Sequence, residues 1–275
     1  ARSKIENFSV PPHVKQIGES CFSECENIKQ FNFSENSELQ IIGKGAFSVS
    51  SLEYILIPPK VNQIDECAFA ECEKLQKVEF SNNSELKKIS KNVFYRSSLE
   101  EISIPVHVTE ICEHAFSECY SFQTISFPKK SKLKIIHKYV FENSSIEKFD
   151  IPSKVTEIKD GWCSHTMNLT QISISPKNDN FIYLDDKMLL GKSNNDSIIY
   201  DILLFARRDI EIAVIPSFIK KICQSAFSEC KSLQKIIFSE NSELESIGNS
   251  AFADSSISNF TIPFRVKEIG ENAFN

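Results

Sequence analysis

Asp160, Cys163 and His165 are the residues whose types and spacing come nearest to a reactive site. A thiol and an imidazole two positions apart, with an acid nearby, are groups that nucleophilic catalysis by cysteine uses. However, Cys163 stands at a place in an internal repeat that phenylalanine fills in the other copies, which predicts a buried side chain. We therefore expect these residues to be structural, and we expect the chain not to be an enzyme.

The nine cysteines could form disulfides, but their spacing argues against this. Four of them, Cys25, Cys72, Cys119 and Cys230, lie three residues after a repeated phenylalanine. Equivalent positions two coils apart would be roughly 9 to 10 Å from one another, beyond the roughly 7 Å over which a disulfide joins two Cα atoms. We predict buried free thiols that act as small apolar side chains. A pair within one coil, Cys112 with Cys119, is the alternative.

The histidines and glycines form no pattern typical of a metal or cofactor site. His13 and His107 follow a proline at the position that Lys60 and Lys154 occupy in other copies, which indicates interchangeable surface residues. There is no Cys-x-x-Cys pair, no His-Glu-x-x-His motif and no glycine-rich phosphate loop, and the chain has only seven glycines. We predict no metal and no cofactor.

The overall charge and hydropathy exclude two classes of partner. The net charge is −6 and the pI about 5.5, with lysine and arginine scattered among acidic residues, so nucleic-acid binding is not expected. The densest apolar run, residues 198–206, is far shorter than the roughly 20 residues that span a bilayer. We expect no membrane insertion within this chain.

Phenylalanine recurs at regular intervals, in most cases directly after alanine. It stands at 22, 47, 69, 94, 116 and 141, and again at 227, 252 and 274, with spacings that alternate between 25 and 22 residues. Pro11, Pro58, Pro105 and Pro152 recur every 47 residues. A period of this size predicts a solenoid whose unit is a pair of unlike coils.

Residues 52–58, Leu-Glu-Tyr-Ile-Leu-Ile-Pro, show how one coil folds. Their alternation predicts a half-buried strand, which Pro58 ends because it has no N–H to donate. Val61, Ile64 and Phe69 complete the inward face. Stacking at the roughly 4.8 Å strand spacing would place each ring on its neighbours in one continuous core. We predict about eleven coils in a column about 50 Å long, with short strands, turns or helical pieces outside the main sheet.

Residues 175–209 interrupt the period. The interval from Pro152 to Pro216 is 64 residues instead of 47, and two strand-like runs flank the acidic pair Asp185 and Asp186. We predict a hairpin-like insertion within one leucine-rich domain, residues 1–275. Because solenoids need polar caps and this sequence starts in a strand and stops at Asn275, we expect a fragment of a longer repeat array.

The coil pattern resembles the BspA-like leucine-rich repeats. The string Leu-x-x-Ile-x-Ile-Pro-x-x-Val-x-x-Ile-x-x-x-Ala-Phe-x-x-Cys covers nearly the whole chain, and Ala-Phe-Ser-Glu-Cys with Asn-Ser-Glu-Leu is similar to the trichomonad, surface-antigen branch. The resemblance implies a right-handed curved superhelix with a parallel sheet on its concave face. It also implies a surface or secreted protein that attaches to host cells, matrix or other microbes. Lys60, His107 and Lys154 depart from the asparagine that follows the strand in leucine-rich repeats generally.

The strand alternation also indicates where a partner binds. Residues on either side of the central apolar residue must face outward. Most of them are polar, and apolar ones invite contact. Our candidates on the expected concave face are Tyr54, Leu56, Lys77, Glu79, Glu101, Ser103, Ile212, Val214 and Ile237. Alternatively, the insertion covers Ile212 and Val214.

Two functions remain open. The first is a cell-surface or secreted adhesion protein, which the resemblance and the Asn-x-Ser/Thr sequons favour. The second is an intracellular scaffold for protein–protein interactions, which the free thiols favour. The sequons begin at Asn7, Asn32, Asn82, Asn143, Asn168, Asn195 and Asn259.

A single core substitution tests the column of rings. Replacing Phe69 by Ala should lower the free energy of unfolding by about 3 to 5 kcal/mol, because a large buried ring is lost and a cavity remains. Denaturant unfolding measures this change, and a midpoint equal to that of the parent would contradict the stacked column.

Overall fold

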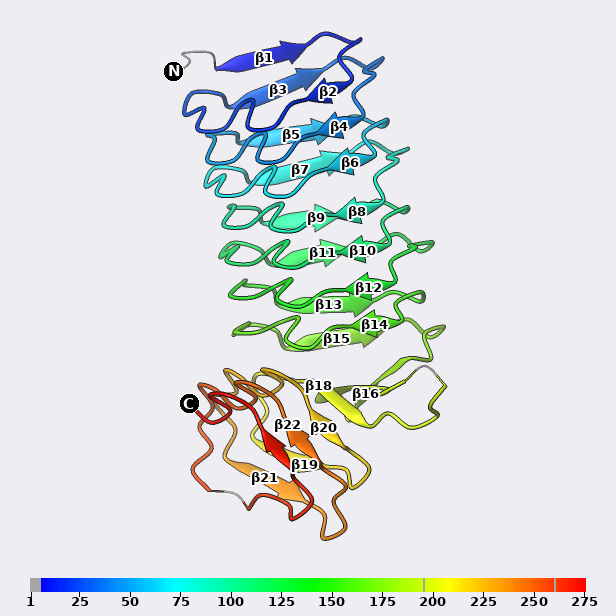
Figure 1. Cartoon of the computed structure of the whole chain (residues 1–275), viewed down its shortest axis with the longest axis vertical. Coiled ribbons are helices and arrows are strands. Elements are labelled where there is room, and N and C mark those ends of the chain that lie inside the picture. Colours follow the sequence, from blue (N-terminus) through cyan, green and yellow to red (C-terminus); the bar gives the residue numbers. More distant parts are fainter. Residues whose placement is uncertain (1–5, 195, 260) are drawn as a thin grey trace.

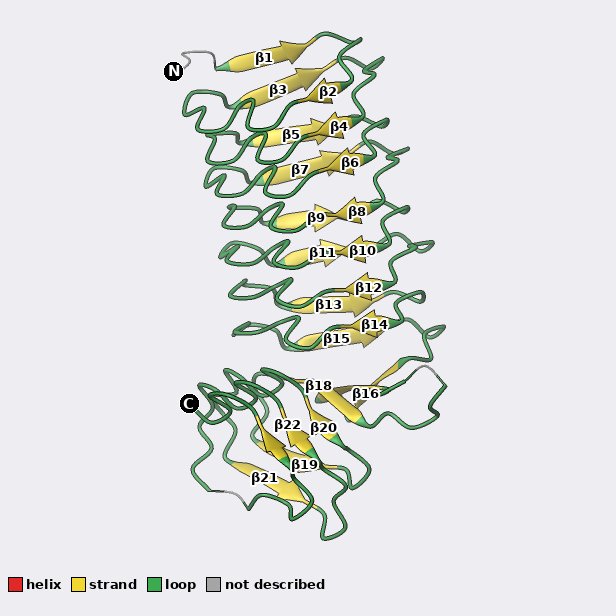
Figure 2. Ribbon diagram, in the orientation of Figure 1, coloured by secondary structure: helices red, strands yellow, loops and turns green. Residues whose placement is uncertain are grey.

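Most coils contribute a long and a short strand, and the coils stack into a β-solenoid (Figure 1). The structure, a computed structural model, describes residues 6–194, 196–259 and 261–275. Within these ranges every regular element is a strand and none is a helix (Figure 2). No described segment is therefore a helix that could span a bilayer. The predicted leucine-rich-repeat solenoid with parallel sheets is confirmed, and turns rather than helical pieces complete each coil.

The long strands pair in parallel and in register within three sheets, so that residues of one repeat position lie side by side. Val78 lies beside Ile55, for example, and both are buried, whereas Glu79 and its neighbour Leu56 lie on the outward face. The pleat therefore buries the central residue and turns its two neighbours outward, as the alternation predicts. The long strands are β1 Asn7–Val10, β3 Gln30–Phe33, β5 Tyr54–Ile57, β7 Lys77–Phe80, β9 Glu101–Ser103, β11 Thr124–Ser126, β13 Lys148–Ile151, β15 Gln171–Ile174, β19 Ile212–Ile215 and β21 Lys235–Phe238. Their three sheets are β1 to β11, β13 with β15, and β19 with β21.

The short strands form a second side of the solenoid. Each has two residues and ends on an isoleucine, which is buried in every strand except the last, β23. They also pair in parallel with neighbouring coils, in three sheets. They are β2 Gln16–Ile17, β4 Ile41–Ile42, β6 Gln63–Ile64, β8 Lys88–Ile89, β10 Glu110–Ile111, β12 Ile135–Ile136, β14 Glu157–Ile158, β20 Lys221–Ile222, β22 Ser246–Ile247 and β23 Glu268–Ile269. The three sheets run from β2 to β6, from β8 to β14 and from β20 to β23.

Turns around each repeated phenylalanine make up the remaining side. Residues two before and two after the ring adopt positive φ, as at Cys67 (57°) and Glu71 (57°) around Phe69. Left-handed backbone costs a non-glycine residue roughly 1–2 kcal/mol. The turn is held because its amides donate to the next coil, such as Phe69 N to the Val93 oxygen at 2.9 Å. Coil-to-coil hydrogen bonds thus run along this side as well as along the sheets.

Phenylalanine rings stack along the interior of the first six coils. The ring of Phe69 lies 5.2 Å from that of Phe47 and 5.7 Å from that of Phe94, centroid to centroid, and the planes are nearly parallel. The rings from Phe47 to Phe141 are fully buried, whereas Phe22 in the first coil is half-buried. Each ring is therefore shielded by the coils beside it rather than by its own coil.

The prediction of one continuous core is wrong at the insertion. The buried apolar residues divide into two clusters that meet at the insertion, where Phe205 belongs to the first and Ala206 to the second. Two coils there reverse the usual small–large order: Trp162 precedes Cys163, and Phe205 precedes Ala206. Trp162 meets Phe205 at 6.3 Å and 62°, so the parallel stack is not continued. The strands of the later coils also run at an angle to the first stack (Figure 1).

Residues 175–209 form an antiparallel excursion. Strand β16, Phe181–Leu184, turns at Asp185 and Asp186, both at positive φ, into β17, Met188–Gly191. Strand β18, Ile202–Ala206, pairs antiparallel with β17 and then parallel with β20. The chain thus leaves the solenoid through a hairpin and rejoins the side formed by the short strands.

Arg208 joins the coils on either side of this excursion. Its guanidinium is buried and donates to the carbonyl oxygens of Thr166 (3.0 Å), Cys163 (3.2 Å) and Ala226 (3.1 Å). It also lies over the ring of Phe205, 4.7 Å from the centroid. A buried cation is costly without partners, and here carbonyl dipoles and an aromatic face supply them. The flat, forked shape of guanidinium lets one side chain reach both coils.

Removing Arg208 should therefore weaken the junction. We expect Arg208→Met to lower the free energy of unfolding by about 3 kcal/mol, because buried carbonyl oxygens on both sides of the junction lose hydrogen bonds to a charged donor. Arg208→Lys should recover only part of this loss, since an ammonium group cannot form the fork. Urea denaturation measures both. The exposed Arg265 is the control, and Arg265→Met should change stability by less than about 0.5 kcal/mol.

Candidate functional site

The face of the long strands carries the predicted binding residues, and the structure turns all nine outward. Leu56 is 43% exposed, and Lys77, Glu101 and Ser103 are exposed beside it. Tyr54 and Glu79 are half-buried because they bond to each other across the strands. Parallel pairing puts Tyr54 beside Lys77 and Lys77 beside Glu101, so residues far apart in the sequence form one surface.

A groove lies over strands β7, β9 and β11. Its volume is about 950 Å³, and its lining includes Leu56, Lys77, Glu79, Glu101 and Ser103. Strands β5 and β7 pair along four residues, whereas the register of β7 and β9 holds only Lys77 with Glu101. Beyond that pair the residues of β7 and β9 are not paired with each other, and the groove lies over this unpaired part. We call this feature the β7–β9 groove.

A second, smaller depression of about 390 Å³ adjoins the groove over β3 and β5. The two share Leu56 and Ser81, and Tyr54, Pro58 and Pro59 line the smaller one. Leu56 therefore lies between the two depressions and lines both of them. Six of the nine predicted residues thus lie in one continuous region.

Tyr54, Lys77 and Glu79 form a polar cluster at the edge of the groove. The Tyr54 hydroxyl donates to Glu79 Oε2 at 2.8 Å, and Lys77 Nζ lies 2.6 Å from Oε1. The hydrogen bond from Lys77, and then that from Tyr54, lowers the pKa of Glu79. Burial and the bond to Glu79 raise the pKa of Tyr54. The carboxylate is thus held charged and oriented, although exposed ion pairs of this kind add little stability.

Ile212, Val214 and Ile237 form a separate apolar patch on β19 and β21. They are 48%, 55% and 38% exposed, and Val214 pairs directly with Ile237. The alternative that the insertion covers Ile212 and Val214 is wrong, because the hairpin strands extend the side of the short strands instead. Lys235 beside Ile212 gives the patch one charged border.

Asp160, Cys163 and His165 are not brought together as a catalytic set. Asp160 pairs with Lys221 at 2.6 Å, His165 Nδ1 lies 3.6 Å from Glu229 Oε1, and Cys163 is buried against Arg208. Burial raises the pKa of the Cys163 thiol to about 11, which makes it a poor nucleophile at neutral pH. The prediction that Cys163 is a buried substitute for phenylalanine is confirmed.

All nine cysteines are free, and the repeated ones are more than apolar filler. Cys72 Sγ donates to the Phe47 oxygen at 3.0 Å, and Cys119 Sγ to the Phe94 oxygen at 2.9 Å. Both are fully buried, as predicted, but Cys25 is half-buried. The alternative disulfide between Cys112 and Cys119 is absent.

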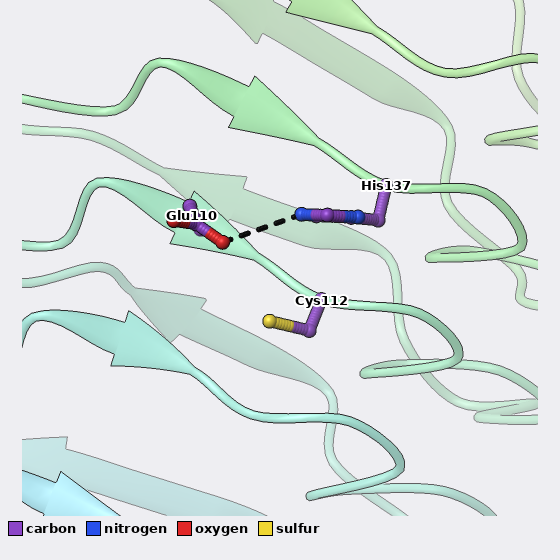
Figure 3. Close-up of side chains that lie close together, drawn as sticks. All are labelled: Glu110, Cys112 and His137. Carbon is purple, nitrogen blue, oxygen red and sulfur yellow. Dashed lines mark hydrogen bonds and ion pairs between the residues drawn. The ribbon is translucent and has the colours of Figure 1, made fainter.

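Sequence reasoning missed two groups of possible metal ligands, of which one contains a sulfur. Glu110, Cys112 and His137 place a carboxylate oxygen, a sulfur and a ring nitrogen within 4.8 Å of one another (Figure 3). The short spacings of familiar metal motifs do not apply, because His137 comes from the next coil. The available signal was the repeat itself: Cys112 and His137 both directly follow the isoleucine of a short strand.

Fold and surface together define a leucine-rich-repeat solenoid with an open, grooved face. The profile of the BspA type leucine rich repeat region matches six copies, over residues 1–88, 87–200 and 199–275. The chain belongs to that family. Proteins of this fold are typically non-catalytic and bind other proteins.

Solved structures share the fold at low sequence identity. The pneumococcal vaccine antigen PcpA superposes with a TM-score of 0.73 at 22% identity, over 96% of this chain and 68% of that one. A leucine rich cell surface protein from Faecalibacterium prausnitzii gives 0.66 at 22%, over 98% and 70%. A leucine-rich repeat protein from Bacteroides ovatus gives 0.62 at 21%, over 97% and 69%. No curated protein sequence matches the chain.

The polar cluster makes a prediction about titration. Glu79 should titrate below the usual range of a glutamate, and Lys77→Met should raise its pKa more than Tyr54→Phe, because the bond from Lys77 is the stronger influence. Since the folded-state pKa is the lower one, the small associated stability is present above the unfolded-state pKa and is lost as pH falls through the folded value. Carbon-detected NMR of the Glu79 carboxyl measures this. An ordinary pKa for Glu79 in the parent would contradict the cluster.

Proposed function

We propose that this chain is a non-catalytic protein-binding module that takes an extended segment of a partner in the β7–β9 groove. The observation that carries the proposal is the groove itself, which opens where β7 and β9 share only one paired position. An extended chain fits there for two reasons. Strand ends that lack a ladder partner offer backbone groups, and a partner's strand can satisfy them.

The groove's side chains suggest the chemistry of the segment. Leu56 offers an apolar contact, Lys77 and Glu101 offer both signs of charge, and Ser103, Thr124 and Ser126 offer hydroxyl groups. A segment with one apolar side chain among polar and charged ones suits this lining. The patch of Ile212, Val214 and Ile237 is a second contact surface of more apolar character.

We further propose that the protein works at the cell surface or after secretion, as an adhesion protein for host-cell, matrix or microbial proteins. Two of the structural relatives are a vaccine antigen and a cell surface protein. Six of the seven sequon asparagines are exposed, which leaves them open to glycosylation, and Asn195 lies outside the described residues. An intracellular scaffold that uses the same groove is the second candidate, which nine free thiols favour.

A binding assay tests the groove. Immobilised matrix proteins and intact target cells are the probes, and the chain is produced without glycosylation because Asn82 lines the groove. For any probe that binds, Leu56→Asp and Glu101→Lys should each weaken the affinity about tenfold or more, equivalent to about 1.4 kcal/mol. Ile212→Asp tests the second patch.

Lys138→Glu, an exposed change on a turn away from the long strands, is the control and should bind like the parent. Equal affinity of Leu56→Asp and the parent, or a loss confined to Ile212→Asp, would contradict the assignment to the groove.

The two candidate functions, surface adhesion protein and intracellular scaffold, differ in where the protein is found in the cell. Antibody labelling of the full-length protein on its native cells, intact against permeabilised, should label intact cells. Labelling only after permeabilisation would exclude the surface adhesin and favour the scaffold, while leaving the groove assignment untouched.

A further inference from the structure

Glu110, Cys112 and His137 meet on the outer side of the short strands. Glu110 lies in β10, Cys112 follows that strand directly, and His137 follows β12 in the next coil. Parallel pairing of β10 with β12 sets the two strand ends side by side, and all three side chains point into the space between them (Figure 3). Glu110 Oε2 and His137 Nε2 are 3.4 Å apart. All three residues are half-buried.

These ligand types indicate which ion would fit. Thiolate, imidazole and carboxylate together are typical of Zn²⁺, with bonds of about 2.3 Å to sulfur and about 2.0 to 2.2 Å to nitrogen and oxygen. In a tetrahedral site such bonds place ligand atoms about 3.3 to 3.8 Å apart. The three atoms here lie within 4.8 Å, so small side-chain rotations would close the site. Mg²⁺ and Ca²⁺ prefer oxygen ligands alone.

Charges of both signs surround the three side chains. Lys88 is the nearest positive group to the Cys112 thiol, and Glu110, Glu113 and Glu66 are the negative ones. Lys88 Nζ is 3.2 Å from Glu110 Oε2 and therefore competes with a metal ion for that carboxylate. Its side chain is half exposed and can leave toward water. Gln63, at the same repeat position one coil earlier, shows that the coil does not require a lysine there.

We propose that Glu110, Cys112 and His137 bind one Zn²⁺ ion that bridges two successive coils. Three protein ligands leave a fourth position for water or for a side chain of a partner. The ion would stabilise the stack, since metal that binds only the folded chain adds to its stability. Binding displaces the proton of the thiol, as metal–thiolate bonds do. This proposal does not depend on the β7–β9 groove.

The other group of possible ligands is the weaker candidate. His165, Glu229 and Asp254 offer no sulfur, Asp254 is exposed, and Glu229 already pairs with Lys231 at 3.2 Å. It also provides a useful contrast, because cobalt bound there would give no sulfur-to-metal absorption band.

Cobalt titration of the reduced protein tests the proposal. Co²⁺ is the spectroscopic probe, and the parent should show a thiolate-to-cobalt charge-transfer band in the near-ultraviolet that saturates at one equivalent and disappears when Zn²⁺ is added. Cys112→Ser should abolish the band and His137→Ser should abolish or greatly weaken it. Serine is tolerated at this repeat position, as Ser90 in the preceding coil indicates, and circular dichroism verifies folding.

Two further variants separate a metal site from general damage. Lys88→Gln should bind Co²⁺ several-fold more tightly, because the competing ammonium is removed. Cys223→Ser changes the cysteine at the same repeat position after β20 and should keep the band. Zn²⁺, but neither Mg²⁺ nor Ca²⁺, should raise the Tm of the parent and leave that of Cys112→Ser unchanged.

The absence of a cobalt–sulfur band in the parent would overturn the proposal, and so would a band that survives Cys112→Ser. Cobalt binding without that band would place the ion at His165, Glu229 and Asp254 or elsewhere, with the same consequence.

Discussion

The stacking of one coil on the next in register is the interaction on which the rest of this structure depends. A single coil cannot bury Phe69, satisfy its own strand amides or hold its turn residues at positive φ. The neighbouring coil does all three, through ring contacts near 5.5 Å and through hydrogen bonds on every side of the solenoid. Stability in such a chain is approximately a sum over interfaces between neighbours. Each interface is therefore both necessary and local.

That dependence explains the junction after β15. The insertion separates two regular stacks, and the reversed pairs Trp162–Cys163 and Phe205–Ala206 prevent the rings from continuing in parallel. Packing alone no longer specifies the interface there. Arg208 donates hydrogen bonds to carbonyl oxygens of both stacks, and these bonds hold the two stacks together where no parallel ring contact does. A guanidinium is suited to this because it has several N–H donors and can bond to carbonyl oxygens of both stacks at once.

The sequence predicts the repeated part of this architecture well and its irregular parts poorly. Spacings of 25 and 22 residues predict the coils, and alternation within residues 52–58 predicts which side chains face out. Both are local patterns with a physical period. The division of the core, the opening between β7 and β9, and the role of Arg208 depend on how two coils meet, which no single coil encodes. Glu110 and His137 are 27 residues apart and become neighbours only through the register of β10 with β12.

Outward positions are where this fold is free to carry function, because their side chains contribute little to the stack. Among the residues that follow the short-strand isoleucine are glycine, aspartate, serine, cysteine and histidine, while the isoleucine itself hardly changes. A site therefore needs no new element, only a suitable combination on adjacent coils. The β7–β9 groove adds a second requirement. Its strands share only the pair of Lys77 with Glu101, and backbone groups without a ladder partner can be satisfied by water or by an added strand, which is the physical basis of the extended-chain binding that we propose.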